Sequence, residues 1–149
     1  MSRGAETGTN REQGFSRSVP SRMEEIDGVC NDARRLLAVA GLEIRQFDTD
    51  LLLREFMANA IEHGNGLAPE KRVSVDFRIG PRWIVVRIAD EGKGFPWRDR
   101  HWHPPGESET SGRGLAIGAL YARRVRYNSA GNQVTIWISK STEKESQGQ

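Results

Sequence analysis

The sequence predicts an α+β fold, a two-layer sandwich in which helices cover one antiparallel or mixed sheet. Apolar residues recur at helical spacing up to about residue 64, and from residue 73 onward they alternate with polar residues. A long polar stretch rich in Gly and Pro separates two pairs of predicted strands. Because 149 residues suit one domain with a real core, we expect a single domain.

Composition and charge exclude several classes of protein. The formal net charge is only +2, and Lys and Arg are scattered, so we expect no direct nucleic-acid binding. Cys30 is the only cysteine and forms no internal disulfide. No segment approaches the roughly 20 apolar residues of a membrane span, and the N-terminus lacks a signal-peptide core. These features predict a cytoplasmic protein with no membrane contact.

The first part of the chain is predicted to be a leader, a strand and a helix. Residues 1–14 have the composition of a disordered leader, and residues 15–20 fit a short edge strand. Ser21 and Glu24 fit a capping box before a helix that ends at Gly41. The domain is expected to cover residues 15–140, followed by a disordered tail over residues 141–149.

The second predicted helix, which Asp48 or Thr49 can cap, contains residues 51–64. Its apolar face is formed by Leu53, Phe56, Met57, Ala60 and Ile61. Glu55 and Asn59 lie one turn apart on the opposite face. An amide oxygen beside a carboxylate can hold a hard cation and a base together, and Mg²⁺ usually shares its oxygen ligands with substrate phosphates. A solvated polar stripe is the alternative interpretation.

Alternation with period two then predicts an antiparallel hairpin over residues 73–79 and 83–90. Asp90 has the same parity as Ile84, Val86 and Ile88, so its carboxylate should point into the layer between sheet and helices. An unpaired carboxylate is costly there, which indicates that a ligand satisfies it.

The region after the hairpin is predicted to be a long loop, a helix and a second hairpin. Residues 91–111 are irregular and polar, as functional or disordered loops are. Gly112 and Gly114 open a helix that should run to about Arg124. Residues 125–129 and 133–140 read as strands, with Val134, Ile136 and Ile138 facing inward. Thr135 has the other parity and is not a candidate site residue.

Three short motifs follow one another on the expected element types. They are Glu55-x-x-x-Asn59 on a helix, Asp90-x-Gly92-x-Gly94 after a strand, and Ser111-Gly-Arg-Gly-Leu115 entering a helix. Together they resemble the N box and the two glycine boxes of the GHKL ATPase superfamily, the Bergerat fold, over roughly residues 15–140. The sequences around Asn59, His63 and Gly112–Leu115 are most similar to those of bacterial anti-sigma factor serine-protein kinases.

The resemblance implies a role for each motif. Asn59 would ligate Mg²⁺ on the ATP phosphates, and Glu55 would deprotonate the attacking hydroxyl. Asp90 would accept a hydrogen bond from the adenine amino group, while Gly92 and Gly94 would let the backbone pass close to the base. The backbone N–H groups of Gly112, Arg113, Gly114 and Leu115 would bind phosphate at a helix N-terminus. Residues 93–110 would be the ATP lid.

Histidines are weaker candidates for a functional role. His101 and His103 lie in the predicted lid without a ligand cluster at metal spacing. His63 follows Asn59 by one turn and could line the pocket, but packing at the helix end or interaction with the helix dipole is the preferred interpretation.

The resemblance also implies biological partners. The chain would be a Mg-ATP-dependent serine-protein kinase that binds a sigma factor and phosphorylates a STAS-type anti-anti-sigma protein, as a homodimer. One alternative is an ATP-binding switch without phosphoryl transfer, against which Glu55 argues. The other is a detached ATPase domain of a histidine kinase. Thr110 stands where that group usually has one more glycine, and no upstream hairpin carries a phosphorylatable histidine.

Overall fold

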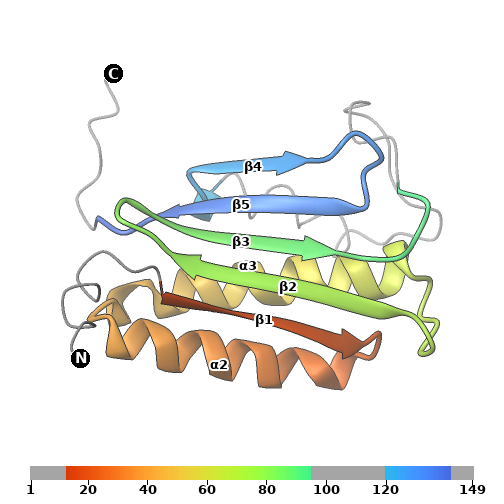
Figure 1. Ribbon diagram of the computed structural model, residues 1–149, viewed down its shortest axis with the longest axis horizontal. Helices are drawn as coiled ribbons and strands as arrows, with labels where there is room; N and C mark the ends of the chain where they lie inside the picture. The colour runs from red at the N-terminus through yellow and green to blue at the C-terminus, as the bar shows by residue number, and fades with distance from the viewer. Residues whose placement is uncertain (1–12, 95–119, 142–149) are drawn as a thin grey trace, which may run out of the picture.

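The computed structural model describes residues 13–94 and 120–141, which form a two-layer α+β sandwich (Figure 1). In chain order its elements are β1 (Gln13–Pro20), η1 (Met23–Glu25), α2 (Ile26–Val39), η2 (Glu43–Arg45), α3 (Gln46–Asn59), η3 (Ala60–Gly64), β2 (Arg72–Ile79), β3 (Trp83–Ala89), β4 (Arg124–Tyr127) and β5 (Gln133–Ser139). The predicted fold class is confirmed. The expected leader and tail lie outside the described residues, except that β1 begins two residues before the predicted strand.

The sheet has five strands in the order β1-β2-β3-β5-β4. Every described pair of neighbours is antiparallel, so of the two predicted alternatives the antiparallel sheet is the one observed. Both predicted hairpins are present, and β1 is the edge strand beside β2.

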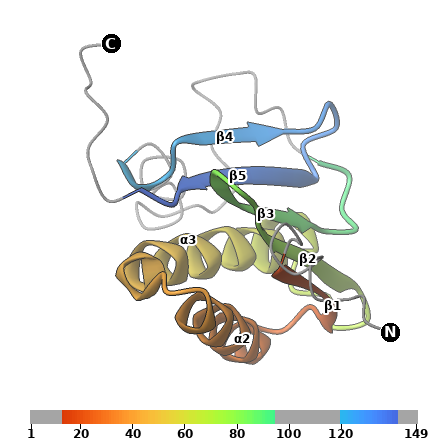
Figure 2. The ribbon, with the colours of Figure 1, turned by 60° about the vertical axis from the view of Figure 1, so that its left-hand side comes forward.

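Both long helices lie on one face of the sheet, as Figure 2 shows. The predicted inward positions of β2, β3 and β5 are buried against them, and so is the predicted apolar face of α3. Phe56 and Met57 are at most 2% exposed, and truncating a core side chain of this size costs about 2–5 kcal/mol. The core therefore fixes α3 on the sheet and leaves the face with Glu55 and Asn59 only half-buried.

The predicted helix caps are wrong at both helices. Ser21 is buried and precedes a 3₁₀ turn, and no side chain caps η1 or α2. Helix α3 begins at Gln46, before Asp48 and Thr49, and Asp48 accepts a hydrogen bond from Arg45 Nη1 at 2.9 Å. Ser21 instead accepts a tertiary hydrogen bond from Asn65, while Asp48 pairs with its near neighbour Arg45.

The helix expected to reach Arg124 ends earlier. Residues 120 and 121 are helical, and β4 begins at Arg124, where Arg124 pairs with Trp137 of β5. Strand pairing with β5 thus takes Arg124 out of the helix. Among the described helices, none has the length and apolar character that crossing a bilayer requires.

Candidate functional site

Helix α3 brings Glu55 and Asn59 to one half-buried face and then changes its geometry. After Asn59 the chain continues as the π turn Ala60–Gly64, and the Asn65 amide donates to the Ala60 carbonyl at 2.8 Å. Single π turns at the ends of α-helices are frequent at functional sites. The wider turn places the backbone of Gly64 against the end of β3.

Asp90 follows β3 and lies where its parity predicted, against the end of the helical layer. Its Oδ1 accepts a hydrogen bond from the Gly92 amide at 2.7 Å. Its Oδ2 accepts no hydrogen bond within the part of the chain that the structure describes. Partial burial raises the pKa of this carboxyl, opposed by the Gly92 hydrogen bond and by the charge of Lys71. An oxygen of this kind is available to a ligand that donates a hydrogen bond.

Glycines make the contact between the π turn and the Asp90 loop possible. A Cβ on Gly64 would collide with the Asp90 carboxylate, and a Cβ on Gly92 would collide with the carbonyl of Gly64. Gly94 has φ +91° and no room for a Cβ beside the Ala130 carbonyl. The glycines expected to admit a ligand are therefore also required by the protein's own packing.

Asn65 joins the π turn to three other segments, a role that sequence reasoning missed. It is 3% exposed. Its Oδ1 accepts from the Glu91 amide at 2.8 Å, and its Nδ2 donates at 3.0 Å to both Ser21 Oγ and the Arg72 carbonyl. The only sequence signal was its place directly after Gly64.

A second asparagine turn supports the Asp90 loop from β4 and β5. The Asn132 carbonyl accepts from the Asp90 amide at 2.9 Å, and Asn132 Nδ2 donates to the Gly92 carbonyl at 3.1 Å. Asn128 Oδ1 accepts from the amides of Gly131 and Asn132 and so fixes the turn. The loop is therefore held on two sides, and the free carboxylate oxygen has a defined position.

Tyr127 adds an aromatic group on the inner side of this region. Its pKa is raised, first by burial and then by the nearby Asp90 carboxylate. His63 has a buried Nε2 without a hydrogen-bond partner among the described residues, which fits the expected packing role at the helix end. Thr135 lies on the opposite face of the sheet, as its parity predicted.

A family model described as histidine kinase-like ATPase domain matches residues 19–138. The chain belongs to this family. No curated protein matches it. Membership in the histidine kinase-like ATPase domain family implies ATP binding and supports the predicted superfamily.

The ATPase domain offers oxygen atoms that can accept a hydrogen bond or ligate a metal ion. The free Oδ2 of Asp90 fits an adenine amino group, and the amide of Asn59 fits one ligand position of Mg²⁺. Within residues 13–94 and 120–141 no three His, Cys, Asp or Glu side chains cluster as a metal site. Asn59 is therefore the residue that would hold a magnesium ion accompanying the nucleotide.

The second glycine motif stays a prediction. Gly112, Arg113, Gly114 and Leu115 lie outside the described residues, as do residues 95–110 of the expected lid with His101 and His103. Of the predicted site residues, the structure brings together Asp90, Gly92 and Gly94 at the end of β3 and places Glu55 and Asn59 on the helix that ends against them.

Proposed function

We propose that this ATPase domain is a Mg-ATP-dependent serine-protein kinase of the anti-sigma type. One observation carries the proposal: Glu55 and Asn59 share a half-buried face of α3, and the π turn that follows this helix lies against Asp90. A module that only binds ATP has no need of a carboxylate one turn before the magnesium ligand. The motif Asn59-Ala-x-x-His63-Gly supports the anti-sigma assignment by resemblance.

Each residue has a distinct role in the proposed reaction. Asp90 binds the adenine amino group, and Asn59 binds the magnesium ion, which neutralises charge on the phosphates. Glu55 accepts the proton of a serine hydroxyl as its oxygen forms a bond to the γ-phosphorus. The bond between this phosphorus and the β,γ-bridging oxygen breaks, and ADP leaves with its electron pair. The products are phosphoserine and ADP.

The proposed partners follow from the resemblance alone. They are a sigma factor and a STAS-type anti-anti-sigma protein that carries the target serine, bound to a homodimer of this chain. Copurification of the native protein, followed by mass spectrometry, would identify them.

Substitution of Glu55 tests the kinase proposal. Glu55→Gln should leave ATP affinity nearly intact, because the charge is needed mainly as the hydroxyl loses its proton. Phosphoryl transfer should fall about 10²–10⁴-fold. Asn59→Ala should lose affinity and transfer together. The measurement is single-turnover transfer from labelled ATP to the copurified STAS-type protein, beside nucleotide binding, with the exposed Glu70→Gln as control.

Three results would change the assignment. If Glu55→Gln transfers phosphate at the wild-type rate, Glu55 is not the general base. Binding of ATP and partner without any transfer would replace the kinase by a switch. An acid-labile phosphate on the product would indicate phosphohistidine, and hence the chemistry of a histidine-kinase domain.

A further inference from the structure

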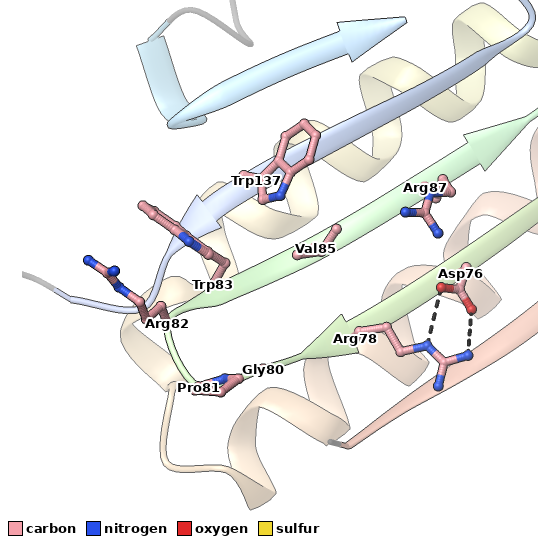
Figure 3. A pocket seen from close by; sticks show the side chains of 9 residues that line it. All are labelled: Asp76, Arg78, Gly80, Pro81, Arg82, Trp83, Val85, Arg87 and Trp137. Carbon is pink, nitrogen blue, oxygen red and sulfur yellow. Dashed lines mark hydrogen bonds and ion pairs between the residues drawn. The ribbon is translucent and has the colours of Figure 1, made fainter. Parts of the chain in front are cut away.

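The sheet face opposite the helices carries an open groove that the ATP site does not use. It holds about 590 Å³ of free space. Figure 3 shows Trp83 and Trp137 standing beside Val85 on neighbouring strands, with Arg78 and Arg87 nearby. These residues have the parity opposite to the buried core positions of β2, β3 and β5.

Strand register arranges these side chains in rows across the sheet. In one row Val85 and Trp137 are paired, with Arg78 on the β2 side and Arg124 on the β4 side. In the next row Asp76, Arg87, Thr135 and Arg126 follow one another. The first row therefore has an apolar centre with an arginine at each end, and the second row adds Arg87 and Arg126 beside it.

This face has more positive charge than the described residues neutralise. Asp76 is already paired with Arg78 at 2.9 Å. Within the described ranges no carboxylate forms an ion pair with Arg82, Arg87, Arg124 or Arg126. The guanidinium groups of Arg82 and Arg124 lie over the rings of Trp83 and Trp137, with their carbons 5.8 and 5.4 Å from the ring centroids. A guanidinium that lies over an indole at this distance can still donate its N–H groups to a carboxylate.

We propose that this outer face binds an acidic amphipathic helix of a partner protein. Carboxylates of the helix pair with Arg87 and Arg124, and its apolar side chains cover Val85 and Trp137. The row from β2 to β4 spans three strand spacings, roughly 14 Å, which accommodates one helix with its side chains. Charge complementarity and an apolar centre together specify this occupant.

Two other occupants fit less well. A second copy packed by twofold symmetry would set arginines against arginines, which is unfavourable. Single-stranded nucleic acid binds through bases stacked on open aromatic faces, and here a guanidinium already covers one face of each indole. The proposal does not depend on ATP binding, because Asp90 lies on the helical side of the sheet.

Charge reversal on this face tests the proposal. The probe is a fluorescein-labelled synthetic helical peptide with a leucine stripe flanked by glutamates, titrated by anisotropy. It should bind the wild type about tenfold more tightly than a matched peptide with glutamine in place of glutamate. The double variant Arg87→Glu with Arg124→Glu should bind the acidic peptide about tenfold or more weakly than the wild type. The control with the same change of charge is Arg22→Glu with Arg35→Glu, two exposed positions on the helical side.

Nuclear magnetic resonance locates the binding. The indole N–H signals of Trp83 and Trp137 should shift with the acidic peptide, and circular dichroism melts check that each variant is folded. Equal binding of the two peptides, or wild-type binding by the reversed variant, overturns the proposal. If a labelled oligodeoxythymidylate binds more tightly than the acidic peptide, the occupant of this face is nucleic acid and not a helix. If the wild type is a dimer and the charge reversal abolishes the dimer, the occupant is a second copy of the chain.

Discussion

At the residue scale, we expect Asp90 to destabilise the free protein while favouring nucleotide binding. Burial raises the pKa of its carboxyl in the folded protein, so the ionised form is disfavoured there. The folded state then binds more protons than the unfolded state between about pH 3.8 and the raised pKa. Stability should therefore fall as the pH rises through this window. The free protein is less stable at neutral pH because it keeps this carboxylate.

Replacing Asp90 by asparagine should separate the two effects. The substituted side chain would keep an acceptor for the Gly92 amide but would carry no charge. Without nucleotide, Asp90→Asn should melt at a higher temperature than the wild type at pH 7, and the difference should shrink toward pH 4. Thermal melts over this range provide the measurement. A variant that melts below the wild type at pH 7 would contradict the burial argument.

Gly64 shows how one missing side chain positions another. A Cβ at Gly64 would collide with the Asp90 carboxylate, so Gly64→Ala must displace the loop. We expect a loss of about 1–3 kcal/mol of stability together with weaker ATP binding. Chemical denaturation and calorimetry measure the two effects.

A glycine elsewhere in a helix is the control for this substitution. Gly28 lies inside α2, and its Cβ would lie 3.3 Å from the guanidinium tip of Arg17, a flexible group. Gly28→Ala should change stability by less than about 1 kcal/mol and leave ATP binding unaltered. Equal effects of the two substitutions would mean that the Gly64 contact has no special role.

At the scale of elements, Asn65 connects the π turn to the strands. Removing its side chain would leave the Glu91 amide and the Arg72 carbonyl without their partner. Asn65→Ala should therefore cost about 2–4 kcal/mol, as the loss of several buried hydrogen bonds does. Asn31→Ala, which removes only an exposed contact with Arg34, should change stability by less than about 0.5 kcal/mol. Similar denaturation midpoints for both variants would mean that Asn65 does not hold the π turn to the strands.

The sequence predicted these elements better than it predicted their junctions. Period-two alternation placed Asp90 in the right layer, and helical periodicity placed Glu55 and Asn59 on the right face of α3. Both patterns are local, so they can be read without the fold. Ser21 shows the limit: its local context indicated a helix cap, whereas its hydroxyl accepts from Asn65, 44 residues away.

At the scale of the whole molecule, we propose a function for each side of the sandwich. One end of the helical side holds the Asp90 loop between the π turn and the Asn132 turn. The outer side of the sheet holds the arginine and tryptophan rows. The contact of Gly64 with Asp90 joins segments far apart in the chain, and no local pattern indicated it. The motifs could therefore be found in the sequence, but the contacts that hold the Asp90 loop could not.

The central claim is that Asp90 recognises the adenine of a bound nucleotide by accepting a hydrogen bond from its amino group. Calorimetry with Mg-ATP and Mg-GTP on the wild type and on Asp90→Asn tests it most directly. We expect micromolar ATP affinity in the wild type, roughly −8 kcal/mol at 1 μM, and clearly weaker GTP binding. Asp90→Asn should weaken ATP binding about 10–100-fold and narrow the preference over GTP, because a hydrogen bond to a charged group is lost. Equal wild-type affinity for ATP and GTP, or unchanged ATP affinity in Asp90→Asn, would contradict the account.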